Sequence, residues 1–121
     1  MHVGEQIPKV ALTTPMEEVV YEMSRKGLGI AVVVDPEEKV TGVISDGDLR
    51  RLLQSRRERV LDQTAGECMT RSPITIGPEE LAASALNLME QRKITCLLVT
   101  DQSARIIGVI HLHDLWGTEM F

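Results

Sequence analysis

Apolar residues follow two different periodicities along this chain, and the two alternate in a regular order. A short alternation over residues 9–12 predicts a strand, and helical spacing of apolar residues over 16–23 predicts an amphipathic helix. Residues 30–34 form a continuous aliphatic run, which is typical of a strand covered on both faces. Residues 35–39 are a turn by composition, and residues 40–45 follow as the partner strand.

Residues that commonly cap helices mark the start of the first helix. Thr14 is predicted as the N-cap, Pro15 as the first helical residue and Glu17 as the partner in a capping box. A second helix is predicted from residue 46 to residue 53, directly after the second hairpin strand. The first unit therefore has the order strand–helix–strand–strand–helix. The charged residues 54–64 that follow are expected to be exposed.

The sequence pattern at the end of this unit occurs again sixty-six positions later in the chain. Gly42–Leu49 is matched by Gly108–Leu115, with the glycine, two β-branched residues, the aspartate and the leucine in the same places. The residue that joins strand to helix differs, because Ser45 is replaced by His111. Such a repeat indicates two copies of one supersecondary unit.

The second copy has the same order of elements as the first. Residues 73–76 are predicted as its short strand, and a helix is predicted to start at Gly77-Pro78. Residues 95–100 and 105–110 are the predicted hairpin strands, and residues 112–116 begin the last helix.

The predicted fold class is α/β (α+β), with two β-α-β-β-α repeats in one tandem module. The first repeat, with its lead-in and connecting segment, is expected over residues 1–64, and the second over residues 65–121. Neither repeat alone can cover both its sheet and its helices, so we expect them to pack about a pseudo-twofold axis.

Composition narrows the class of protein further. With one Trp, one Tyr and one Phe among 121 residues, the core must be aliphatic. The net charge of −5 argues against a nucleic-acid partner, which normally needs a basic surface. No apolar run is long enough to cross a membrane, the N-terminus has no signal-peptide character, and the two cysteines form no C-x-x-C motif. A cytoplasmic location with reduced thiols is expected.

Two units that each end in Gly-x-x-(Ser/His)-x-x-Asp-Leu resemble a tandem pair of CBS domains, and residues 67–73 resemble the linker of that family. The similarity extends to the C-terminal CBS pair of bacterial arabinose-5-phosphate isomerases, through residues 1–8, 41–51, 85–89 and 111–115. Those enzymes act early in the synthesis of Kdo, a sugar of lipopolysaccharide. Nothing in the chain resembles their sugar-isomerase domain. The resemblance therefore implies a regulatory module without chemistry of its own, and no cofactor is expected.

The candidate ligand-binding residues are Ser45, Asp48, His111, Asp114, Thr13, Thr75, Ile30, Thr95 and Arg50. The resemblance implies that Asp48 accepts hydrogen bonds from the ribose hydroxyls of a nucleotide and that Ser45 donates toward ribose or phosphate. Both residues also fit a purely structural capping box. Carboxylates suit vicinal diols, and helix N-termini suit phosphates, so the two roles are compatible.

The other candidates have a structural alternative as well. His111 and Asp114 are the second-copy equivalents, and His111 departs from the hydroxyl that CBS units often have at this place. Either it contacts a phosphate or sugar carboxylate, or it caps the last helix. Thr13 and Thr75 either offer a hydroxyl or backbone group to a base or serve only as capping residues.

Ile30 and Thr95 lie at the start of the two central strands, which in CBS pairs line the pocket for the base. The alternative is that both strands are only part of the core. Arg50 is the member of an arginine cluster that we consider as a phosphate or partner contact; solvated arginines near a helix end are the alternative.

Metal binding and catalysis are both disfavoured. The His-x-His-Asp sequence at residues 111–114 invites a zinc hypothesis, but metal sites need three or four converging ligands and only His2 remains among the histidines. Cys96 lies among apolar residues in a predicted strand, where burial makes a poor nucleophile.

Two functions follow as hypotheses. In the first, the pair senses a nucleotide or nucleotide-sugar, with adenine nucleotides and CMP-Kdo as candidates, and modulates an attached N-terminal sugar-isomerase domain. In the second, it is a ligand-free oligomerisation module. A homodimer formed through the CBS pairs is expected in either case.

Overall fold

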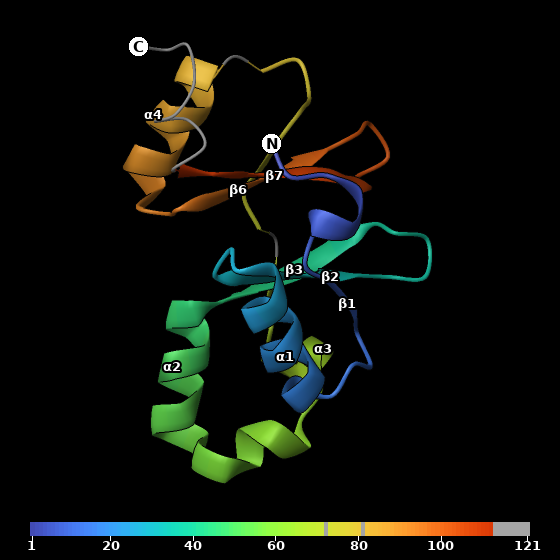
Figure 1. The fold of residues 1–121 in the computed structure, drawn as a ribbon, viewed down its shortest axis with the longest axis vertical. Helices are drawn as coiled ribbons and strands as arrows, with labels where there is room; N and C mark the ends of the chain where they lie inside the picture. Colours follow the sequence, from blue (N-terminus) through green and yellow to red (C-terminus); the bar gives the residue numbers. More distant parts are fainter. Residues whose placement is uncertain (72, 81, 113–121) are drawn as a thin grey trace. The chain divides into compact units, whose positions relative to one another are not determined.

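The computed structural model describes residues 1–71, 73–80 and 82–112 of the chain, which divides into two compact units (Figure 1). One unit is formed by residues 8–73. The other is formed by residues 1–7 together with the chain from residue 74 onward. Each unit combines helices with a mixed sheet, as the α+β class requires.

The division differs from the boundary expected between residues 64 and 65. In the structure, the backbone of residues 70–71, which we expected in the second repeat, pairs with the first repeat, where Arg71 lies opposite Gly42. The N-terminal segment joins the second repeat, because the backbones of His2 and Val109 exchange N–H···O bonds of 2.8 and 2.9 Å. Backbone pairing rather than sequence order therefore decides which segment belongs to which unit.

The unit of residues 8–73 has a four-stranded sheet in the order β1-β2-β3-β4. Its strands are β1 (Lys9–Ala11), β2 (Ile30–Val34), β3 (Val40–Ser45) and β4 (Thr70–Arg71). Strand β1 runs parallel to β2, while β3 is antiparallel to both of its neighbours.

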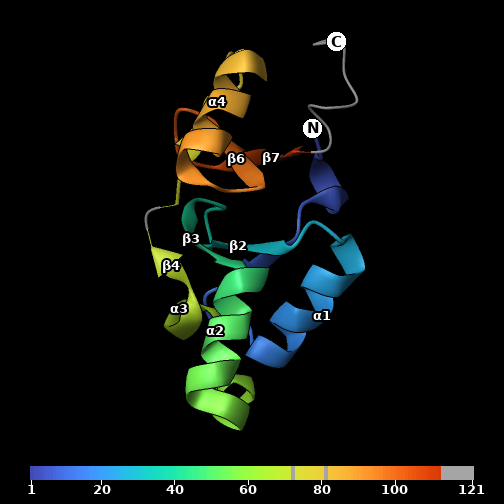
Figure 2. The ribbon, with the colours of Figure 1, turned by 90° about the vertical axis from the view of Figure 1, so that its left-hand side faces the viewer.

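Four helical segments lie to one side of this sheet (Figures 1 and 2). They are α1 (Met16–Lys26), α2 (Asp46–Arg56), the 3₁₀ helix η2 (Arg57–Asp62) and α3 (Ala65–Cys68). Helix α1, strand β2 and η2 supply the centre of an aliphatic core, where Met16, Val19, Ala31, Val33 and Val60 are fully buried.

The start of α1 differs from the prediction. Pro15 is the N-cap and Met16 the first helical residue, without a capping side chain. The Thr14 hydroxyl instead accepts a 2.9 Å hydrogen bond from the Ala11 N–H and closes the turn after β1. The Met16 N–H donates to the Gln63 carbonyl at 2.8 Å, so a backbone group satisfies the donor that a cap would otherwise have taken.

The segment after the second predicted helix also differs. We expected residues 54–64 to be charged and exposed. Most of them are exposed, but α2 continues to Arg56 and is followed directly by η2. Val60 within η2 is fully buried in the core. Burial of the Val60 side chain therefore holds this largely charged segment against the core of the unit.

The other unit contains η1 (Gly4–Gln6), β5 (Thr75–Ile76), α4 (Ala82–Arg92), β6 (Cys96–Thr100) and β7 (Ile106–His111). Its sheet has the order β5-β6-β7, with β5 parallel and β7 antiparallel to β6. Ala85 and Met89 of α4 pack with Leu97 of β6 in its core. As described, α4 begins after the predicted Gly77-Pro78 start, since residues 78–79 form a turn. The last helix predicted, over residues 112–116, lies outside the described residues from 113 onward.

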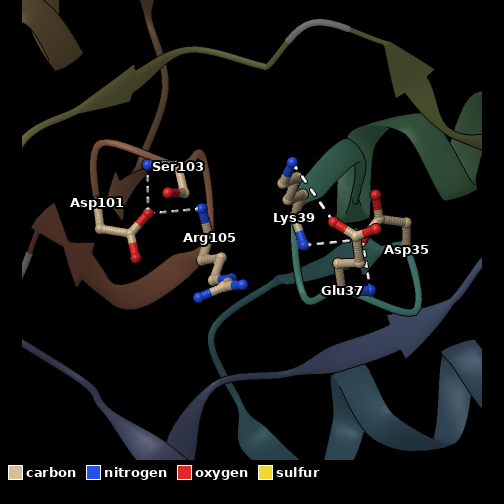
Figure 3. Close-up of polar contacts among 6 residues, drawn as sticks. All are labelled: Asp35, Glu37, Lys39, Asp101, Ser103 and Arg105. Carbon is tan, nitrogen blue, oxygen red and sulfur yellow. Dashed lines mark hydrogen bonds and ion pairs between the residues drawn. The ribbon is translucent and has the colours of Figure 1, made fainter.

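The turns of the β2–β3 and β6–β7 hairpins contain the same pair of hydrogen bonds to an aspartate (Figure 3). Oδ1 of Asp35 accepts from the N–H groups of Glu37 and Lys39 at 2.8 and 3.0 Å. Sixty-six residues later, Oδ1 of Asp101 accepts from Ser103 and Arg105 at the same two distances. An aspartate at the first turn position is thus used identically in both repeats.

We predict that Val60→Ala lowers the free energy of unfolding by about 2 kcal/mol, because it leaves a cavity in the core. Leu61→Ala is the matched control, since the neighbouring Leu61 side chain is 46% exposed and its loss should cost less than about 0.5 kcal/mol. Urea unfolding of both variants measures the difference. Equal losses of unfolding free energy in the two variants would mean that packing of Val60 does not hold η2 against the core.

Candidate functional site

Strand β3 turns into helix α2 without a loop, and one residue serves both elements. Ser45 is the last residue of β3 and the N-cap of α2, with extended backbone angles. Its hydroxyl accepts from the Asp48 N–H at 3.1 Å, and Oδ2 of Asp48 accepts from the Ser45 N–H at 3.0 Å. The predicted capping box is therefore present, and it fixes the Asp48 carboxylate at the helix N-terminus.

The second carboxylate oxygen of Asp48 has a different partner. Oδ1 accepts from Nη2 of Arg51 at 2.6 Å, one helical turn along α2. The Thr70 hydroxyl of β4 lies 3.5 Å from Oδ2, at the limit of a hydrogen bond. The Asp48 side chain is 22% exposed and that of Arg51 is 70% exposed, so this end of the group faces solvent.

Electrostatics keep Asp48 ionised. Partial burial by itself raises the pKa of the carboxyl group. The hydrogen bonds from Ser45 and the bond and charge of Arg51 outweigh burial and hold the pKa below its ordinary value. At neutral pH the junction presents a fixed carboxylate that only accepts hydrogen bonds.

The start of β2 lies beside this junction. Ile30 is the register partner of Ser45, and the Gly29 carbonyl accepts from the Asp46 N–H at 3.0 Å. Gly29 has φ of +74°, and a Cβ there would lie 2.9 Å from Oδ2 of Asp46. Glycine therefore lets the chain enter β2 this close to the helix. The structure thus brings together Ser45, Asp48 and Ile30 of the candidate residues.

The second repeat builds the same junction on a different residue type. His111 is the register partner of Cys96, and the Leu112 N–H donates to the Thr95 carbonyl at 2.8 Å. This bond is the counterpart of the one between Asp46 and Gly29. Thr75 lies farther along, opposite Leu98. Asp114 lies outside the described residues.

Thr13 is not brought to the Ser45 junction. It follows β1, whose end pairs with Val34, whereas Ser45 pairs with Ile30 at the opposite end of β2, about 13 Å away at strand spacing. The register partner of Val32 is Lys9, so Lys9 rather than Thr13 is the counterpart of Thr75. Thr13 instead lines a separate surface hollow of about 890 Å³, with residues of β1, α1 and the β2–β3 turn.

The arginine beside the carboxylate is Arg51, not the Arg50 that we singled out. Arg50 is exposed, and Arg51 forms the contact because residues three apart are neighbours on a helix surface. The spacing from Asp48 to Arg51 was the signal in the sequence, and it was missed.

Two kinds of feature are absent from the described part of the chain. Within it, no three His, Cys, Asp or Glu side chains are grouped closely enough to hold a metal ion. In the same residues no helix has the length and apolar content to span a membrane. Cys68 and Cys96 are both buried. Burial, with a smaller effect of Glu67, raises the pKa of the Cys68 thiol above its ordinary value despite nearby Arg56.

Comparison with known families agrees with this repeated geometry. The CBS domain model matches residues 3–55 and again residues 65–115, which together account for most of the sequence. The chain belongs to the CBS domain family. Each match includes one of the two strand-to-helix junctions, at Ser45 in the first and at His111 in the second.

Curated relatives extend the similarity. The chain is 45% identical to arabinose 5-phosphate isomerase KdsD of Pseudomonas aeruginosa over 95% of its length, and 38% identical to KdsD of Escherichia coli K12 over the same share. It spans only about a third of these relatives, 35% and 34% of their lengths.

Solved CBS structures share the fold. The complex of CBSX2 with AMP superposes with a TM-score of 0.84 at 24% identity, covering 96% of this chain and 89% of CBSX2. The AMP complex of the CBS domain protein PAE2072 from Pyrobaculum aerophilum gives 0.81 at 24% identity, covering 93% and 85%.

We predict that the contribution of Asp48 to the free energy of unfolding depends on pH. Because its pKa is lower when folded, the ionised group stabilises the fold above its ordinary pKa, and this contribution is lost as pH falls through the lowered value. The difference in unfolding free energy between the protein and Asp48→Asn should therefore shrink between about pH 5 and pH 3. Urea unfolding across this range measures it, with exposed Asp62→Asn as the control for removing one charge. A constant difference would contradict the lowered pKa.

Proposed function

We propose that the chain is a ligand-sensing regulatory module that binds a nucleotide or nucleotide-sugar at the β3–α2 junction. The observation that carries this proposal is the Asp48 carboxylate, fixed by the capping box and ionised at neutral pH. A fixed carboxylate accepts both hydrogen bonds of a vicinal diol such as ribose. The N-terminus of α2, an eleven-residue helix, favours a phosphate beside it.

Family membership supports the ligand class. Two CBS structures with the same fold, CBSX2 and PAE2072, contain AMP, which makes adenine nucleotides the first candidates here. The similarity to arabinose 5-phosphate isomerases adds CMP-Kdo, the activated sugar of the Kdo pathway, as a feedback signal. At the second junction we assign ligand contacts to His111, Thr95 and Asp114, with Thr75 farther along the sheet. Ile30 is retained as a backbone contact at the first junction, and Arg50 as a phosphate or partner contact. Thr13, which lies toward the other end of β2, is retained only as a hydroxyl or backbone contact for a part of the ligand that extends along the sheet.

Regulation would act through a shift of populations. A ligand that binds one conformation of the module more tightly favours that conformation, by no more than its difference in affinity. An arabinose-5-phosphate isomerase domain attached to the module would then be activated or inhibited. The chemistry would belong to that domain, and the CBS repeats would carry the signal.

A thermal-unfolding panel with AMP, ADP, ATP, CMP and CMP-Kdo tests the proposal. A ligand at one hundred times its Kd adds about 2.7 kcal/mol to stability, which corresponds to an upward shift of several degrees in Tm. Asp48→Ala should abolish that shift and cost about 1 kcal/mol through the lost cap contact. No shift with any of the five ligands would overturn the proposal.

The matched control for Asp48→Ala is Glu67→Ala. Oε1 of Glu67 accepts from the N–H and hydroxyl of Thr64, both at 3.0 Å, at the start of α3. The variant therefore removes a comparable helix-start contact away from the β3–α2 junction. It should lower Tm without changing the ligand-induced shift. If it abolishes the shift as well, the effect of Asp48→Ala is one of stability alone.

A second candidate is assembly, favoured by apolar side chains exposed on the helices of the first unit. Tyr21 of α1 is 67% exposed and Leu53 of α2 is 45% exposed. Homodimerisation through these helices would cover them. Sedimentation equilibrium should then show a dimer that Tyr21→Ser weakens, and a monomer at all concentrations would remove this candidate.

A further inference from the structure

The contact between Arg51 and Asp48 bears on what a ligand must do to bind at the β3–α2 junction. Oδ2 of Asp48 already accepts the capping hydrogen bond from the Ser45 N–H at 3.0 Å, and the Thr70 hydroxyl of β4 lies 3.5 Å from the same oxygen. Oδ1 is the oxygen left for a ligand, and the Arg51 guanidinium occupies it at 2.6 Å. A ribose diol that binds this carboxylate therefore competes directly with Arg51.

The displaced guanidinium would remain at the same end of the helix. Arg51 also reaches over Gly47 in the first turn of α2, where its Nη1 would lie 3.4 Å from a Cβ built on that glycine. It is largely exposed, so it can turn away from Asp48 without unpacking the core. A guanidinium beside a helix N-terminus is well suited to bind a phosphate group through two parallel hydrogen bonds.

We propose that Arg51 is the specificity-determining residue of this junction and selects phosphorylated nucleosides over nucleosides. In the free protein it neutralises Asp48. When a nucleotide binds, the ribose takes Oδ1 and Arg51 moves to the phosphate, so the phosphate compensates for the broken ion pair. A nucleoside without phosphate displaces Arg51 and offers it no new partner. This inference rests on the proposed nucleotide site and adds the residue that discriminates within it.

The first repeat alone has an arginine at this place in the sequence. Gly117 stands sixty-six positions after Arg51, so the second repeat has no equivalent guanidinium. We therefore expect an arginine to select for a phosphate group at the Ser45 junction and not at the His111 junction.

Calorimetric titration with two matched pairs, adenosine with AMP and cytidine with CMP, tests the inference. Each pair differs only in the 5′-phosphate. In the unaltered protein the nucleotide of the pair that binds should have about a tenfold to hundredfold lower Kd than its nucleoside, as expected for a charge-assisted contact. In Arg51→Ala this ratio should fall to about fivefold or less, the part that the N-terminus of α2 supplies, with the nucleoside bound equally well or more tightly.

Arg59→Ala is the control, because it removes the same charge from an exposed position of η2, away from the β3–α2 junction. It should leave the ratio within about twofold of that of the unaltered protein, since long-range attraction alone changes little at physiological salt. Arg51→Lys keeps the charge without the two-pronged geometry and should recover only part of the ratio.

The outcomes separate the inference from the function on which it rests. If the unaltered protein binds a nucleotide and Arg51→Ala preserves the nucleotide-to-nucleoside ratio, the role of Arg51 is overturned and the nucleotide site stands. A parallel loss of nucleoside and nucleotide affinity would assign Arg51 to positioning Asp48 instead, and would also overturn the inference. If the unaltered protein binds no member of either pair, the proposed site and the inference fail together.

Discussion

The direct passage from strand β3 into helix α2 constrains the arrangement of the surrounding residues. A helix start leaves backbone N–H groups without intrahelical partners, and here no loop is present to supply them. Ser45 and Asp48 satisfy two of these donors reciprocally, while the Gly29 carbonyl accepts a third from Asp46. The geometry of the helix start is thereby tied to the first residues of β2. The same hydrogen bonds that complete the backbone place a carboxylate at the surface.

The second repeat shows which part of this arrangement belongs to the fold and which to the side chains. The bond from Leu112 N–H to Thr95 repeats the bond from Asp46 N–H to Gly29, and both hairpins use an aspartate in the same way. Backbone geometry is therefore shared, although His111 replaces Ser45. Because the scaffold is independent of the residue at the junction, the two junctions are free to differ in what they recognise.

The elements with strong periodicity were predictable from the sequence, and the exceptions have identifiable physical causes. Strands β2 and β3 and the capping box of α2 followed from local patterns. The prediction of Thr14 as the N-cap of α1 was wrong, because the Met16 N–H donates to the carbonyl of Gln63, which is distant in sequence. The burial of Val60 was not predicted, because two adjacent apolar residues, Val60 and Leu61, among charged ones show no periodicity that tells which of them is buried. Register, which separates Thr13 from Ser45, depends on strand pairing that no local pattern contains.

The structural and the ligand-binding interpretations of Asp48 do not compete, because the two carboxylate oxygens have separate partners. A cap needs only one oxygen: Oε1 of Glu67 alone accepts both bonds from Thr64 at the start of α3. At α2 the cap likewise uses Oδ2, which leaves Oδ1 facing solvent and Arg51. A residue that the fold must hold in place is well suited to recognition, because its geometry is already fixed before a ligand arrives. The exposed ion pair with Arg51 is the weaker contact, and it is the one that a ligand would exchange.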